Sequence, residues 1–422
     1  MKPIKIISIV AVAALLGWHT SAQIYDTNGD YVQTFAGSGE AGYVDGQGQL
    51  TKFSSPSQIV ADTSSNLYVW DSGNYLIRKI TPGGTVSTFV GGGLPPEIEG
   101  YGTNVSLSSY SFGAMAMDHF NTIWAVVGYG NSYYFLNIGT NGSVFIENGG
   151  SGLVNLSTSS GICFDSANNL YYSGRNIIYR YNPSTGISQP FAGNGTSGYR
   201  DGNGTVFPEF SSPGALACDE ADNIYVSDAS NYKIRRIDQS QNISTVAGSG
   251  AYVNDIDGFG TNAAFYYPGI SQMFADNVGN IYFACGSCIR KMNAATNVVT
   301  LAGSFSQSSY ANGAGSLARF NGASGVCLSQ GMVFVADANN ELIRNITFNP
   351  TSQAVSGANL GIGTFAGVTI TGTVGRTYQI QSSPDMNTWT TRATLLLTSS
   401  PYLWIDQNPV SGNKFYRALL LP

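Results

Sequence analysis

Two stretches of this chain, NLYVWDSGNYLIRKI at residues 66–80 and NIYVSDASNYKIRRI at residues 223–237, are near-copies of one another. A third copy, MVFVADANNELIRNI, covers residues 332–346, and a shortened one, NIYFACGSCIRKM, covers residues 280–292. Two degenerate copies lie between the first two. Together the copies recur at intervals of about 50 residues, and self-similarity at such a period predicts a repeat architecture.

Each copy follows the same internal plan. A short apolar run after Pro or Gly leads into an Asx-rich turn, and an alternating strand such as residues 67–70 follows. A turn with Asp and Asn comes next, then a strand that holds an arginine, and a final strand ends in a T-x-A-G pattern, as at residues 245–248. Four antiparallel strands per repeat are typical of a propeller blade. The sequence therefore predicts an all-β, six-bladed β-propeller.

The two ends of the repeat region complement one another. Residues 31–37, YVQTFAG, form a final-strand pattern with no earlier strands before them, whereas the copy at 332–346 has no final strand directly after it. An open ring would expose two sheet edges. We therefore expect residues 31–37 to complete the last blade. The similar Thr364–Gly367 pattern is assigned to the domain that follows.

The copies resemble NHL repeats. The resemblance covers about residues 30–350 and is specific in four of the six copies; the two that begin at Asn121 and Asn169 depart from it. It includes a loop pattern ending in Asp-Gly or Asn-Gly, at 45–46, 201–202, 257–258 and 312–313. Similarity to other six-bladed rings, of the TolB-like, lactonase and strictosidine-synthase kinds, is weaker. The resemblance implies a propeller that serves as a binding or surface scaffold.

The sequence outside the repeats predicts export and a second module. Residues 1–22 carry lysines, an apolar run and small residues, the layout of a secretory signal peptide, and no later run is long enough to span a membrane. The propeller then occupies residues 23–350, and a small polar linker covers 351–360. Residues 361–422 read as five short strands, which predict a C-terminal β-sandwich. We expect a secreted or cell-surface protein, with the C-terminal module as a candidate for surface attachment.

Composition narrows the functions that the chain can perform. The net charge is −6 and only 10% of residues are charged, with no basic stripe, so nucleic acid is not an expected partner. The chain has two histidines, too few for a His-rich zinc site of the kind that NHL-type peptide-amidating lyases use. We expect a non-catalytic protein without a cofactor that binds a protein, peptide or glycan. The alternative is a Ca²⁺-dependent, gluconolactonase-like hydrolase or lyase on the same ring.

Irregular copies are the first candidates for a binding site. The second and third copies are rich in tyrosine, which offers broad contact and a polar tip to peptides or sugars. Packing of these rings between blades is the alternative interpretation. The candidate binding residues are Tyr129, Tyr133, Tyr134, Tyr171, Tyr172 and Arg175.

Two further sets of residues have alternative interpretations. Asp45, Asp201, Asp257 and Asn312 sit in the Asp-Gly or Asn-Gly loops, where they serve either as ordinary turn residues or as Ca²⁺ ligands on one face of the ring. Cys285 and Cys288, in the sequence CGSC, form either a small disulfide across a strand turn or two free thiols. The Asp, Asn and Arg that recur in the copies, such as Asp71, Asn74 and Arg78, are expected to support the scaffold.

Overall fold

In the computed structural model the chain divides into two units, Met1–Gln353 and Ala354–Pro422. The structure describes residues 30–95, 98–129, 132–147, 156–157, 159–206, 208–252, 254–266, 270–348, 367–370, 376–383, 388–396, 402–405 and 415–420. The predicted signal peptide and the 351–360 linker lie outside these residues. No helix in the described ranges is both long and apolar enough to cross a membrane.

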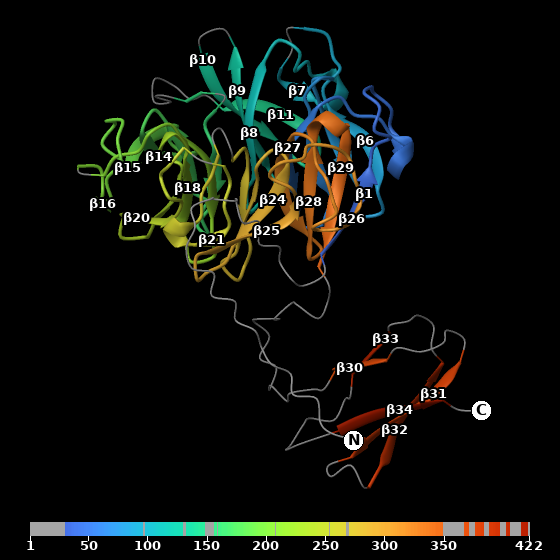
Figure 1. Ribbon diagram of the computed structural model, residues 1–422. Helices are drawn as coiled ribbons and strands as arrows, with labels where there is room; N and C mark the ends of the chain where they lie inside the picture. Colours follow the sequence, from blue (N-terminus) through green and yellow to red (C-terminus); the bar gives the residue numbers. More distant parts are fainter. Residues whose placement is uncertain are drawn as a thin grey trace. The chain divides into compact units, whose positions relative to one another are not determined.

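The first unit is the predicted six-bladed propeller (Figure 1). Every blade is an antiparallel sheet whose first strand lies innermost. Blade one consists of β3 (Pro56–Ala61), β4 (Leu67–Asp71), β5 (Leu76–Ile80) and β6 (Thr85–Val90), with β2 (Gly46–Gln47) as a short edge strand. Blade two consists of β8 (Ser111–Met117), β9 (Ile123–Tyr129), β10 (Ser132–Ile138) and β11 (Ser143–Glu147), with β7 (Gly100–Tyr101) at its edge. Blade three consists of β12 (Ile162–Phe164), β13 (Leu170–Gly174), β14 (Ile177–Asn182) and β15 (Ile187–Ala192).

The remaining three blades repeat this order. Blade four consists of β17 (Pro213–Cys218), β18 (Ile224–Asp228), β19 (Lys233–Ile237) and β20 (Asn242–Ala247), with β16 (Gly202–Asn203) at its edge. Blade five consists of β22 (Met273–Ala275), β23 (Ile281–Ala284), β24 (Cys288–Met292) and β25 (Asn297–Gly303), with β21 (Gly258–Phe259) at its edge. Blade six consists of β27 (Ala323–Ser329), β28 (Met332–Asp337), β29 (Leu342–Thr347) and β1 (Tyr31–Ala36), with β26 (Gly313–Ala314) at its edge. Short 3₁₀ turns lie at η1 (Gly48–Leu50), η2 (Gly102–Asn104), η3 (Ala229–Asn231), η4 (Gly260–Asn262) and η5 (Ala338–Asn340).

Blade six draws its outer strand from the start of the propeller sequence. Strand β1 pairs antiparallel with β29, with Tyr31 opposite Thr347 and Val32 opposite Ile346. Around the ring axis each innermost strand contacts the next, and β27 contacts β3. The ring is therefore continuous, and β1, the first strand of the propeller sequence, lies between β29 and the short edge strand β26 in the sixth sheet.

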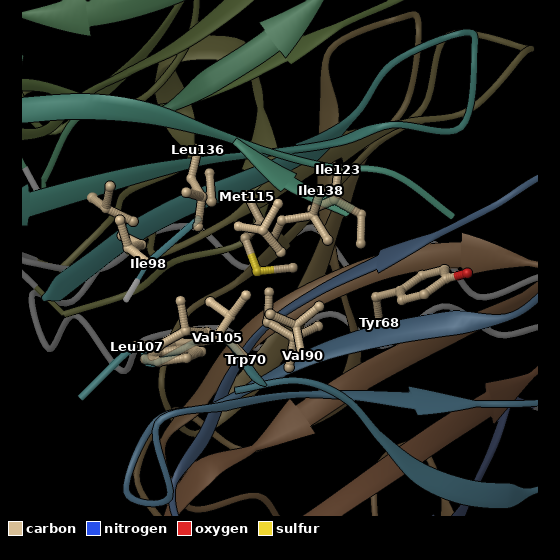
Figure 2. Close-up of a cluster of buried hydrophobic side chains, with 14 of the residues drawn as sticks. Tyr68, Trp70, Val90, Ile98, Val105, Leu107, Met115, Ile123, Leu136 and Ile138 are labelled. Atoms are coloured by element: carbon tan, nitrogen blue, oxygen red, sulfur yellow. The ribbon is translucent and has the colours of Figure 1, made fainter. Parts of the chain in front are cut away.

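A hydrophobic core fills each gap between neighbouring blades. The alternating strands send side chains to both faces of a sheet, and both faces meet a neighbouring blade, so the strands are apolar on both sides. Figure 2 shows the core between blades one and two, where Tyr68 and Trp70 face Met115, Leu136 and Ile138. Five further clusters occupy the other five gaps.

The second unit contains two small antiparallel sheets. Strand β30 (Gly367–Ile370) pairs with β33 (Tyr402–Ile405), while β31 (Thr377–Ser383) lies between β32 (Thr390–Leu396) and β34 (Phe415–Leu420). These are the short strands that the sequence predicts. The β-sandwich arrangement of the two sheets remains a prediction.

Candidate functional site

The arginines that recur in four blades are structural. In blade four, Arg235 is fully buried and its Nη1 donates to Asp228 Oδ2 at 2.7 Å, while its Nη2 donates to Asp201 Oδ1 at 2.6 Å. The guanidinium lies between the rings of Tyr199 and Phe210, 5.0 and 5.1 Å from their centroids. Each arginine therefore ties its blade to the loop that leads into it.

The candidate metal ligands belong to these same clusters. Asp45 accepts from Arg78, Asp201 from Arg235, Asp257 from Arg290, and Asn312 from Arg344. The four residues thus lie in four different blades, each against its own arginine. The described residues contain no group of three or more His, Cys, Asp or Glu side chains arranged to hold a metal ion.

Blades two and three lack the cluster. Val127 and Leu136 of blade two take the strand positions of Asp71 and Arg78, because Ala125 faces Leu136 as Val69 faces Arg78. In blade three the corresponding residues are Gly174 and Tyr179, and Tyr179 stacks on Tyr172 at 5.0 Å. Acid and base are thus replaced together. This joint replacement is expected, because a buried aspartate or arginine without its partner would leave an unpaired charge that destabilises the fold.

Blade five keeps its arginine but has a shorter turn. Cys285 stands where blades one, four and six have the aspartate, and Asp255 supplies a carboxylate in its place, with its Oδ1 accepting from Arg290 Nη1 at 3.0 Å. Cys285 and Cys288 are free thiols whose Sγ atoms lie 2.7 Å apart. Cys288 is buried, whereas Cys285 is partly exposed.

We predict that mild oxidation joins Cys285 to Cys288. Burial raises the pKa of the thiols of Cys163, Cys218 and Cys327, and that of Cys288 as well, so the partly exposed Cys285 is the thiol that an oxidant reaches first. The Sγ of Cys288, 2.7 Å away, is then its partner. Titration of the denatured protein after oxidation should show the loss of two of the five thiols. The variant Cys285→Ser should lose none. An unchanged thiol count in the wild type would contradict this prediction.

Two cavities lie along the ring axis and meet at one waist. The large cavity, of about 830 Å³, lies where the innermost strands begin. The small cavity, of about 150 Å³, lies where they end. The waist consists of the residues that line both: Met115, Ile162, Leu216, Gln272 and Met273.

Gln272 is the polar member of this waist. Its Oε1 accepts from the backbone N–H of Ile59 at 3.3 Å and of Val326 at 3.0 Å, and its Nε2 donates to the Ile59 carbonyl at 3.1 Å. A buried side chain of blade five thus joins blades six and one. Gly325 lets blades six and one approach closely enough for Gln272 to reach both, because a Cβ at this position would collide with the Ser57 carbonyl oxygen.

The large cavity has a mixed lining drawn from five blades. Serine hydroxyls, glycine backbone and one aromatic ring, Phe112, surround it, and Arg175 is the one charged side chain among the described lining residues. Its volume is in the range of small-molecule sites. The small cavity is lined mainly by Met, Cys and apolar residues, with His119 at its edge. The Nε2 of His119 hydrogen bonds with the Asp165 carbonyl at 2.8 Å.

Of the candidate binding residues, the structure places Arg175 in the large cavity. Tyr171 and Tyr172 are buried in the cores on either side of blade three, and Tyr133 and Tyr134 pack against cores on the two faces of blade two. Tyr129 is 55% exposed and its ring lies 5.1 Å from that of Tyr110. Phe112 and Gln272 were not among the predicted binding residues, and the available signal for Gln272 was a glutamine directly before the apolar inner strand β22.

Comparisons with known proteins support the fold. No family model matches the chain. A curated relative, Protein SUPPRESSOR OF QUENCHING 1, chloroplastic, of Arabidopsis thaliana, is 25% identical over 331 residues, which cover 74% of this chain. The chain spans only 27% of that protein's length.

Several solved structures are similar. A protein of unknown function from Bacteroides thetaiotaomicron has a TM-score of 0.58 at 20% identity, covering 75% of this chain and 76% of that chain. Auxiliary nutrient binding proteins from Bacteroides thetaiotaomicron and Bacteroides ovatus have TM-scores of 0.55 and 0.57 at 19% and 15% identity. The match to the Bacteroides thetaiotaomicron protein covers 76% of each chain. The match to the Bacteroides ovatus protein covers 76% of this chain and 77% of that chain. These TM-scores show a shared fold.

Proposed function

We propose that this protein is an exported, non-catalytic binding propeller whose ligand occupies the large cavity. The observation that carries the proposal is the cavity itself, a space of about 830 Å³ with hydroxyl, amide and aromatic groups converging from five blades. Two solved propellers of the same fold are described as auxiliary nutrient binding proteins, which is compatible with this function. The C-terminal unit would serve to place the propeller at a surface.

The chemistry of the lining favours binding over catalysis. The described lining residues include serines but no His, Asp, Glu, Lys or Cys that would act as their general base. A Ca²⁺-dependent hydrolase would need several oxygen ligands, usually with carboxylates among them. The described lining has no carboxylate, and Asp45, Asp201 and Asp257 are engaged by arginines of three separate blades.

We predict that filling the cavity abolishes ligand-induced stabilisation. The test is a thermal-shift screen of the mature protein against soluble saccharides and short peptides, because a ligand at 100 times its Kd stabilises by about 2.7 kcal/mol. Ser57→Trp places an indole among the lining residues and should remove the shift. Leu94→Trp, at a residue that is 84% exposed, is the control and should retain it. Equal shifts in both variants would place the ligand elsewhere.

A further inference from the structure

Arg175 differs from the arginines of the repeat. Arg78, Arg235, Arg290 and Arg344 are fully buried and bonded to carboxylate or amide oxygens. Arg175 is exposed in the large cavity and makes no hydrogen bond or ion pair within the part of the chain that the structure describes. Its five N–H donors are therefore available to a ligand.

The backbone holds Arg175 in an unusual conformation. Gly174 pairs with Ile177, so Arg175 and Asn176 form a two-residue hairpin loop, and both have positive φ, 40° and 48°. Asparagine suits this conformation, whereas arginine does so only at a cost. The turn is fixed to its surroundings, because Asn176 Oδ1 accepts from the Ser212 N–H at 3.1 Å and its Nδ2 donates to the Gly195 carbonyl at 3.2 Å.

A flat aromatic surface lies in the same cavity. The ring of Phe112 stacks on Trp70 with centroids 4.0 Å apart and an angle of 16° between the planes. Trp70 is buried in the core between blades one and two (Figure 2), so it supports Phe112 from behind. The hydroxyls of Ser57 and Ser212 and the amide of Gln58 are further polar groups of the lining. An aromatic ring in one cavity with hydroxyls and amides suits the apolar face and the hydroxyl edge of a sugar.

We propose that the large cavity binds a saccharide that carries a carboxylate, with the carboxylate on Arg175 and a sugar ring on Phe112. This inference rests on the proposed function and names its ligand class. A guanidinium donates two parallel hydrogen bonds to a carboxylate. A carboxylate is favoured over a phosphate, because a doubly charged group would meet one cation in a chain of net charge −6. Uronic acids are the simplest ligands of this class.

The test compares acidic and neutral sugars that differ only at one carbon. Affinities of the full mature protein for galacturonate and galactose, glucuronate and glucose, and their short oligomers are measured by isothermal titration calorimetry. We expect each uronate to bind at least tenfold more tightly than its neutral partner. Glucose 6-phosphate is the third arm, and tighter binding of it than of glucuronate would overturn the carboxylate assignment.

Variants separate the charge from the cavity. Arg175→Asn keeps a residue that favours the turn, and it should lower the affinity for uronates at least tenfold more than the affinity for neutral sugars. Phe112→Ala should weaken both classes. Arg180→Ala is the control, because Arg180 is an exposed arginine of the same hairpin that bonds Asn169 and lies outside the cavity lining.

The two proposals fail in different ways. Equal binding of uronates and neutral sugars, unchanged in Arg175→Asn but lost in Ser57→Trp, would overturn the ligand class and leave the binding cavity intact. Binding of peptides but not sugars, again lost in Ser57→Trp, would do the same. No ligand-induced shift sensitive to Ser57→Trp, for any sugar or peptide, would overturn the proposed function itself.

Discussion

Replacing Arg235 with leucine is expected to destabilise the propeller by about 3–5 kcal/mol, the usual result of removing one partner from a buried ion pair. Asp228 would remain buried, with the Ser211 N–H at 2.7 Å and Asn231 Nδ2 at 2.8 Å as its other donors. Urea unfolding measures the loss. Arg236→Leu, at the partly exposed neighbouring residue, is the matched control and should cost less than about 1 kcal/mol.

The double variant Asp228→Val, Arg235→Leu tests whether an apolar pair, as in blade two, can replace the buried ion pair of blade four. Blade two carries Val127 and Leu136 at these positions. We expect the double variant to lose at least about 1 kcal/mol less than the sum of the two single variants, because it leaves no unpaired buried charge. Strict additivity would show that the charge left unpaired in each single variant is not the source of its cost.

The cost of Arg235→Leu should also depend on pH. Burial raises the pKa of the Asp228 carboxyl, and the hydrogen bonds from Ser211 and Asn231 and the charge of Arg235 oppose this rise. Without Arg235, the pKa of Asp228 in the folded state moves further above its value in the unfolded state. The variant therefore keeps its stability below the unfolded-state pKa of Asp228 and loses it as the pH rises through the folded-state pKa. The difference from wild type should therefore be smaller at pH 4 than at pH 7.5. A pH-independent difference would indicate that Asp228 does not carry the penalty.

The repeats made the scaffold predictable. The recurring Asp, Asn and Arg, with strands such as Leu67–Asp71 on either side, indicate one blade per copy, and the number of copies gives the number of blades. The arginine recurs in four blades because each of them attaches its incoming loop to the sheet through this buried side chain, whereas blades two and three have apolar or aromatic residues instead. Because these residues act within a single blade, they recur in the sequence with the repeat and can be recognised there.

The cavity was much less predictable, because it depends on several blades at once. Arg175 was a candidate through its place in an irregular copy, but Tyr171 and Tyr172 in that copy lie in cores. Period-two alternation cannot separate a tyrosine that faces a ligand from one that faces the next blade, since both faces of the sheet are covered. Phe112 is placed by its stack on Trp70, a contact between blades that no single copy encodes.

Strand β1 is expected to be essential for the ring. Val32 is fully buried in the core between blades five and six, and Ala36 in the core between blades six and one. Val32→Asp places a charge among these apolar residues and should cost more than about 3 kcal/mol. Gln33→Asp, at the exposed neighbouring residue, should change stability by less than about 0.5 kcal/mol. Similar effects of the two substitutions would show that β1 is not held in the ring.

Moving β1 to the other end of the propeller separates the contribution of the strand from that of its chain connection. Deletion of residues 30–36 should abolish cooperative thermal unfolding, because β29 loses its outer neighbour and two cores are opened. A permuted chain that starts at Gly37 and joins Thr347 to Asp30 through a short Asn-Gly turn should restore it. Tyr31 lies opposite Thr347, so a tight hairpin can replace the natural break, as Asp238–Gln241 joins β19 to β20. If the permuted chain melts no more cooperatively than the deletion, the stability of the ring depends on more than the pairing of β1 with β29.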